Sequence, residues 1–217
     1  MRALLFPAAL MICTATLVAA DGAGEWKTLF DQQSGAGWKT FNGEGFPKEG
    51  WEIRDGAIHA LPAQMMPCLA TVDDYDDFEL AFEWKISRGG NAGVFYANRM
   101  DRVRPGHYRV HSSRGQEYQI LDDAHSPEAR EPSKSAAARY GKVAPAAGKP
   151  LKPAGEWNEG RIVVRGLHAE HWLNGMKVLE YTLSPEDKVR SPIVLQHHHD
   201  EAWFRNIRIR VLQSRGD

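Results

Sequence analysis

The amino-acid sequence predicts an all-β, single-domain sandwich or jelly roll of two antiparallel sheets. After residue 25, strand-like runs alternate apolar and polar side chains with a period of two, as half-buried antiparallel strands do. Turn signals separate these runs at the spacing of a sandwich. No run longer than about ten residues shows a helical period. The length of 217 residues, with 42% hydrophobic and 25% charged residues, suits one globular domain.

The strands follow in order along the chain. Residues 51–54 and 57–61 flank Asp55-Gly56, a tight hairpin turn. Residues 78–86 show the longest alternation, which predicts an apolar core face and a solvated face carrying Glu79, Glu83 and Lys85. Further strands are expected at residues 92–97, 116–121, 161–165, 168–173, 177–181, 191–196 and 203–211, with a turn at Asn174-Gly175. The best helix candidate, residues 134–140, lies in a long loop over residues 124–153, and loops of that size are often functional.

The first twenty residues read as an export signal, with Arg2, an apolar run and small residues before Asp21. We expect cleavage after Ala20, a mature domain over residues 21–217, and a periplasmic or secreted location. Ile12 before Cys13 argues against a lipid anchor, so the mature chain would keep Cys68 as its one thiol. No later apolar run reaches about 18 residues, so no membrane insertion is expected. With 27 basic and 28 acidic residues, no broad field favours a nucleic acid partner.

The most informative polar group lies on the expected strand at residues 116–121. Glu117 and Gln119 share one face, while Tyr118 and Ile120 point to the other. A bulge or strand end at Leu121 would bring Asp122 round beside them. The alternative is an ordinary solvated strand face closed by a turn, since polar residues commonly face outward in antiparallel sheets.

A second group is the run from Gln196 to Asp200, where Gln196 and His198 share a face and His197 faces the core with Leu195. Three adjacent histidines suggest zinc, but strand neighbours point to opposite faces and no Cys or HExxH partner has metal spacing. His198 acting with carboxylates as base, acid or ligand fits better. No cofactor is certain, and a divalent metal stays open. Further candidates, each with a structural alternative, are Asn91, Tyr140 and Arg205.

Taken in order, these motifs resemble the 3-keto-disaccharide hydrolase family over nearly the whole mature chain. That family has a concanavalin A-like jelly roll. The matching pieces are Leu29-Phe30-Asp31, Gly37-Trp38, residues 51–56, 77–80 and 83–85, 90–94 and 117–122, Tyr140-Gly141, residues 155–158 and 173–175, Leu195-Gln196 with His198, and residues 204–207. The chain departs from the pattern at Ala92, Ala97 and His199, where the family usually has Ser, Arg and Gly. Arg99, Arg102 or Arg104 could replace the missing arginine.

The resemblance implies a small sugar substrate already oxidised at carbon 3 by a separate oxidoreductase. A ketone at C3 acidifies the C2 proton, so a base can remove it and expel the C1 substituent, and water can then add back. Glu117 or His198 would be the base, and Asp122 or Tyr140 would protonate the leaving oxygen. The remaining site residues, which would hold hydroxyls or the enolate or otherwise contact substrate, are Gln119, Gln196, Asn91, Glu83 and Arg205.

Two other readings stay open. A laminarinase-type retaining glycosidase has Glu-x-Asp-x-x-Glu where this chain has Glu117-x-Gln119-x-x-Asp122. Retaining hydrolysis needs carboxyl groups about 5–5.5 Å apart, and the shorter Asp122 would widen that gap. A lectin-like sugar-binding module shares the fold, but the titratable groups on one strand face argue for chemistry.

Overall fold

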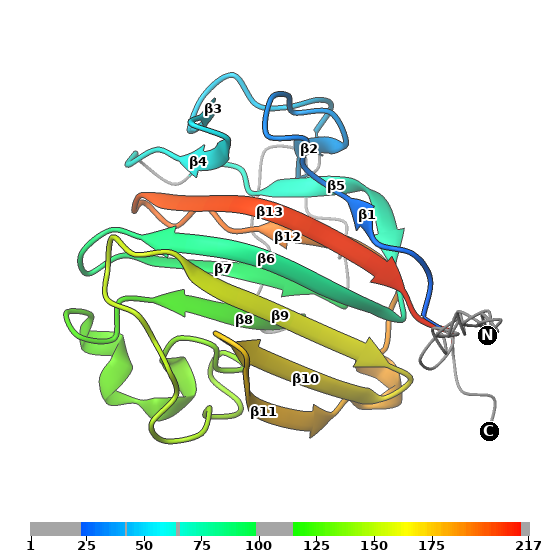
Figure 1. Cartoon of the computed structure of the whole chain (residues 1–217), viewed down its shortest axis with the longest axis vertical. Helices are drawn as coiled ribbons and strands as arrows, with labels where there is room; N and C mark the ends of the chain where they lie inside the picture. Colours follow the sequence, from blue (N-terminus) through cyan, green and yellow to red (C-terminus); the bar gives the residue numbers. More distant parts are fainter. Residues whose placement is uncertain (1–22, 42, 64–65, 99–114, 214–217) are drawn as a thin grey trace, which may run out of the picture.

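The structure, a computed structural model, describes residues 23–41, 43–63, 66–98 and 115–213 and contains two stacked antiparallel sheets (Figure 1). The larger, eight-stranded sheet has the order β11-β10-β9-β6-β13-β4-β3, with β1 also paired to β13. The smaller, five-stranded sheet has the order β2-β5-β12-β7-β8. The strands are β1 (Lys27–Thr28), β2 (Trp38–Thr40), β3 (Trp51–Arg54), β4 (Ala57–Ala60), β5 (Leu69–Tyr75), β6 (Phe78–Ile86), β7 (Asn91–Tyr96), β8 (Gln116–Leu121), β9 (Asn158–Arg165), β10 (His168–Leu173), β11 (Met176–Thr182), β12 (Ser191–Leu195) and β13 (Ala202–Val211).

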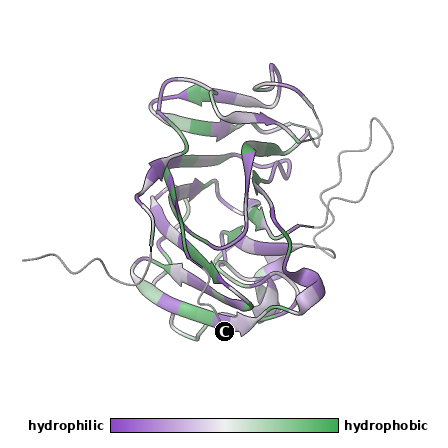
Figure 2. Cartoon of the chain, turned by 90° about the vertical axis from the view of Figure 1, so that its right-hand side faces the viewer, coloured by the Kyte–Doolittle hydropathy of each residue, from purple (hydrophilic) through white to green (hydrophobic). Residues whose placement is uncertain are grey.

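This architecture confirms the predicted all-β sandwich of two antiparallel sheets. Strand β6 buries Phe78, Leu80, Phe82, Trp84 and Ile86, as its alternation predicts. Asp55 and Gly56 both have positive φ, 50° and 72°, as a two-residue turn of this kind requires. Figure 2 shows apolar segments, in green, within the strands of both sheets. The strands β1, β2 and β5 have no counterpart among the predicted ones.

The core lies between the sheets. Phe82 of β6 contacts Tyr118 of β8 edge to face, with ring centroids 5.4 Å apart, and Phe78 contacts Tyr96 of β7 in the same way at 6.1 Å. Tyr96 also hydrogen-bonds the buried His171 of β10 at 2.6 Å. These contacts define the inner faces of both sheets. They therefore place Glu117 and Gln119, the alternate residues of β8, on the outer face of the smaller sheet.

That outer face is buried as well, which rules out the alternative of an ordinary solvated strand face. Every residue of β7 and β8 is buried. A second apolar cluster, formed by Phe41, Cys68, Ala70, Phe95 and Val194, covers part of the outer face. Its row across the sheet runs from Ala70 through Val194 and Phe95 and ends at Glu117. The Glu117 carboxyl is therefore placed at the end of an apolar surface.

The predicted helix at residues 134–140 is wrong. The loop instead contains two short 3₁₀ helices, η2 (Pro127–Arg130) and η3 (Pro132–Lys134), and then runs along the free edge of β8. Ala137, with φ of 63°, donates its N–H to the carbonyl of Gln119, and the carbonyl of Ala138 accepts from the Gln119 N–H. These backbone groups bond to a strand rather than to their own preceding turn. A third 3₁₀ helix, η4 (Pro185–Asp187), precedes β12. None of these described helices is long and apolar enough to span a bilayer.

Candidate active site

The candidate site lies on the outer face of the smaller sheet, where β7 and β8 pair. Gly93 is opposite Gln119, and Phe95 is opposite Glu117. Gln196, just beyond β12, donates its backbone N–H to the Gly93 carbonyl at 2.9 Å. Two residues beyond His198, Asp200 accepts from the Asn91 backbone N–H at 3.0 Å. The segment that carries Gln196 and His198 is therefore fixed along β7. This agrees with the prediction that these two residues belong to the same site as Glu117 and Gln119.

The Glu117 carboxyl occupies space that a glycine leaves open. A Cβ on Gly93 would lie 2.5 Å from Glu117 Oε1, so a side chain there would displace the carboxyl. Glu117 is only 4% exposed. Burial, and after it the negative charge of Glu128, raises the pKa of Glu117 to about 8. A carboxylate with such a pKa is a stronger base than a solvated one.

Glu128, on η2, joins this group, and strand periodicity gave no sign of it. Its carboxylate accepts from Asn91 Nδ2 at 3.1 Å and from the Tyr140 hydroxyl at 3.0 Å. Gln119 Nε2 in turn donates to Asn91 Oδ1 at 3.3 Å. The only local signal is the helix start at Ser126-Pro127, which marks a turn but not a site. A connected polar network therefore links β7, β8 and the loop.

Tyr140 reaches the site because its segment pairs with β8. Its backbone N–H donates to the Glu117 carbonyl at 3.2 Å. Burial, and after it the hydrogen bond to Glu128, raises the pKa of Tyr140 to about 12. The phenol is therefore a neutral proton donor near neutral pH.

Three polar atoms of the site are buried without a protein partner among the described residues: Gln119 Oε1, Gln196 Oε1 and His198 Nδ1. Buried polar atoms normally have partners, because leaving one unpaired costs about 1–3 kcal/mol. Two acceptors and an imidazole nitrogen in one neighbourhood suit a ligand rich in hydroxyl groups. All three residues were singled out from the sequence.

Asp122 does not come round beside Glu117. The pairing of β7 with β8 runs without a bulge from Asn91 opposite Leu121 to Tyr96 opposite Gln116. Asp122 accepts from Gly89 N at 2.8 Å, from Ala124 N at 3.2 Å and from His125 Nδ1 at 2.7 Å. Although burial opposes it, these bonds lower the pKa of Asp122. It is an ionised residue that fixes the turn between β6 and β7.

Glu83 and Arg205 are also separate from this group. They lie on the larger sheet, where Arg205 Nε donates to Glu83 Oε2 at 2.7 Å and Asn206 Nδ2 donates to Oε1 at 2.6 Å. Their neighbours Trp84 and Phe204 face the core, so both side chains are on the outer face of that sheet. The structure therefore does not bring them to Glu117.

The adjacent histidines point to different partners. His197 Nε2 donates to the Leu61 carbonyl at 2.9 Å, and His199 Nδ1 bonds the Ala63 carbonyl at 3.2 Å. His199 has φ of 65°, the left-handed conformation that the family's usual glycine adopts easily.

Several sequence predictions fall on residues outside the described ranges. These are the export signal, Cys13, and the proposed replacements for the arginine missing at Ala97, which are Arg99, Arg102 and Arg104.

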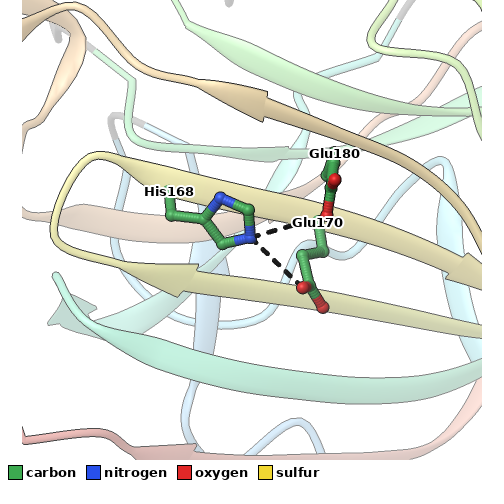
Figure 3. A group of neighbouring side chains, drawn as sticks. All are labelled: His168, Glu170 and Glu180. Atoms are coloured by element: carbon green, nitrogen blue, oxygen red, sulfur yellow. Dashed lines mark hydrogen bonds and ion pairs between the residues drawn. The ribbon is translucent and has the colours of Figure 1, made fainter.

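Within the described ranges, one group of side chains has metal-type ligand atoms close together, and it is elsewhere. His168, Glu170 and Glu180 meet on β10 and β11 (Figure 3). Lys177 forms ion pairs with both glutamates, and Trp172 Nε1 donates to Glu170 at 2.7 Å. The carboxylates are thus already balanced by a cation in a surface ion-pair network.

Replacing His197 and His198 separately should distinguish a residue that stabilises the fold from one that takes part in the reaction. His197 is 1% exposed and contacts Trp51 edge to face at 5.7 Å, so His197→Ala should lower the free energy of unfolding by ~1–3 kcal/mol. His198→Ala should lower turnover with little change in stability. Urea unfolding and steady-state kinetics measure the two effects. The opposite pattern would reverse the roles assigned to the two rings.

The fold and the buried polar site define a concanavalin A-like jelly-roll protein with a group of carboxyl, amide and phenol side chains on its smaller sheet. Residues 25–210 match the 3-keto-alpha-glucoside-1,2-lyase-like domain family, and the chain belongs to that family. It is 29% identical to the 3-keto-disaccharide hydrolase of Bacteroides thetaiotaomicron, over 90% of this chain and 80% of that protein.

Two solved structures show the same fold. A candidate glycosyl hydrolase of Parabacteroides distasonis has a TM-score of 0.75 and 27% identity, covering 88% of this chain and 94% of its own. The β-glucanase of Bacillus licheniformis has a TM-score of 0.52 at 10% identity, covering 89% and 99%, which is a likeness of fold alone.

Proposed function

We propose that this protein cleaves the glycosidic bond of 3-keto-glycosides, including 3-keto-disaccharides. The buried Glu117 carboxyl, with its raised pKa, is the observation that supports this most directly. Family membership and the named activity of the Bacteroides relative agree with it. An oxidoreductase acting on carbon 3 must supply the substrate. Export to the periplasm or medium is proposed from residues 1–20 alone.

In the proposed reaction, Glu117 removes the C2 proton, which the neighbouring ketone makes acidic. The electron pair moves into an enolate, and the C1–O bond then breaks to give an enone. Gln119 and Asn91, joined through their amides, hold hydroxyls or the enolate oxygen. The neutral phenol of Tyr140, or His198, protonates the departing oxygen. Addition of water to the enone would complete net hydrolysis.

A retaining glycosidase is the second candidate, because the structure places a second carboxyl, Glu128, near Glu117. Glu128 accepts hydrogen bonds from both Asn91 and Tyr140. Membership of the 3-keto-alpha-glucoside-1,2-lyase-like domain family favours elimination over retention.

One incubation in heavy water should separate these reactions. The protein is given matched ordinary and 3-keto disaccharides, and products are followed at early times by mass spectrometry and NMR. We expect cleavage of the 3-keto substrate only, with deuterium at C2 of the product, because the abstracted proton exchanges with solvent. An incubation of product without enzyme corrects for spontaneous exchange. Cleavage of the ordinary disaccharide without C2 deuterium would favour the retaining glycosidase.

A further inference from the structure

A groove of about 650 Å³ crosses the outer face of the larger sheet, away from the Glu117 site. This sheet faces the viewer in Figure 1, with β13, β6 and β9 in front of the smaller sheet. The volume lies within the range of small-molecule binding sites. It cannot belong to the proposed reaction, because the lining residues come from β1, β6, β9, β10, β13 and the adjoining loops.

The groove exists because a short side chain forms its floor. Ala81 of β6 points outward, whereas the space left by Gly160 of β9 opens toward the core and is filled by Phe82. Ala81 is paired with Arg161 on one side and Arg208 on the other. Both long side chains are drawn away from it. Arg161 stacks over Trp172 at 3.7 Å and pairs with Glu79 at 2.9 Å, while Arg208 lies 4.9 Å from the ring of Trp26.

The walls carry hydrogen-bonding groups already held in place. A bulge in β13 between Arg205 and Arg208 brings Asn206 to the rim. Asn206 donates to Glu83 at 2.6 Å and accepts from Gln32 Nε2 at 3.0 Å. Fixed polar groups lose little conformational freedom when a ligand binds. The opposite wall is the half-buried pair of Trp172 and Arg161.

The charge of the groove indicates the kind of ligand. The residues that line it include two acidic ones, Glu83 and Glu159, and two basic ones, Arg161 and Arg208. This balance gives no net attraction for a polyanion, and covering the charges with an apolar segment would be costly. A neutral ligand with many hydroxyls can bond to carboxylates and amides and place its C–H groups against the indole.

We propose that this groove is a second, non-catalytic binding site for a neutral oligosaccharide or polysaccharide chain. It is independent of the 3-keto chemistry and lies on the other sheet from Glu117. Binding here would keep the protein on a carbohydrate polymer while the Glu117 site acts on small glycosides.

The test uses native gels containing laminarin, dextran or xyloglucan, and titration calorimetry with the polymer that retards the protein. Ala81→Phe fills the groove floor without removing a polar group, and Val163→Phe adds the same ring elsewhere on the same sheet face as its control. Asn206→Gly is a second variant that keeps the positive φ of 52° and removes the amide.

We expect retardation of the wild type by at least one neutral polymer, and a Kd raised about tenfold or more by Ala81→Phe and by Asn206→Gly. Val163→Phe and Glu117→Gln should bind as the wild type does, which separates this site from the proposed reaction. No retardation by any neutral polymer, unchanged binding by Ala81→Phe, or equal retardation by heparin would each overturn the proposal.

Discussion

Replacing Glu117 by glutamine should lower turnover of a 3-keto-disaccharide by about 10²–10⁴-fold. Glutamine keeps the size of the side chain and the space over Gly93, but it cannot accept a proton from C2. Because the change leaves the neighbouring amides in place, substrate binding should be affected much less than kcat. Steady-state kinetics on the purified protein would measure both quantities.

Glu156→Gln is the matched control, since Glu156 is exposed and lies in the loop before β9. It should retain full turnover. Full turnover by Glu117→Gln would remove this carboxyl from the reaction and leave His198 as the candidate base. A Glu117→Gln protein that loses only affinity would make Glu117 a binding residue instead.

The same substitution should change how stability depends on pH. The ordinary pKa of a glutamate is 4.5, and in the folded protein that of Glu117 is raised to about 8. Between these values the folded state keeps a proton that the unfolded state has released, so this group makes stability fall as pH rises. Relative to pH 5, the wild type should lose ~2–4 kcal/mol of folding free energy by pH 9 through Glu117, at 1.4 kcal/mol per pKa unit with a discount for relaxation.

Urea unfolding of the wild type and of Glu117→Gln from pH 5 to pH 9 would measure this loss as a difference. The contributions of the other titrating groups to the pH dependence are nearly the same in both proteins and cancel in this difference. Glu156→Gln again serves as the control. The variant should be more stable than the wild type at pH 9. Turnover of the wild type should rise over the same interval, because the base must be ionised. Parallel stability curves for wild type and variant would contradict a raised pKa at Glu117.

Local pattern was enough to predict the strands that carry the site. The alternation of β6 and the Asp55-Gly56 turn depend on neighbours in sequence, and both follow the prediction. Glu117 and Gln119 share a face for the same reason. Strand β5 was missed because its run Thr71-Val72-Asp73-Asp74 is mostly exposed and does not alternate.

The remaining parts of the site depend on tertiary contacts. Glu128 reaches Asn91 and Tyr140 only because the long loop folds back on the sheet. The period of two left open whether the outer face of β8 is an ordinary solvated face, because its burial depends on what packs over it. Glu83 was predicted to contact substrate, but it lies on the other sheet from Glu117. Neither the alternation of residues nor the order of motifs along the chain tells which of the two sheets a strand joins.

The backbone bonds from residues 137–140 to β8 also affect solubility. An uncovered last strand offers a row of free N–H and C=O groups to other chains, and so promotes aggregation. Here the N–H groups of Ala137 and Tyr140 and the carbonyl of Ala138 occupy that row. The segment that brings the Tyr140 phenol to Glu128 is therefore also the cover of a sheet edge. Changes that loosen this segment should promote aggregation as well as lower activity.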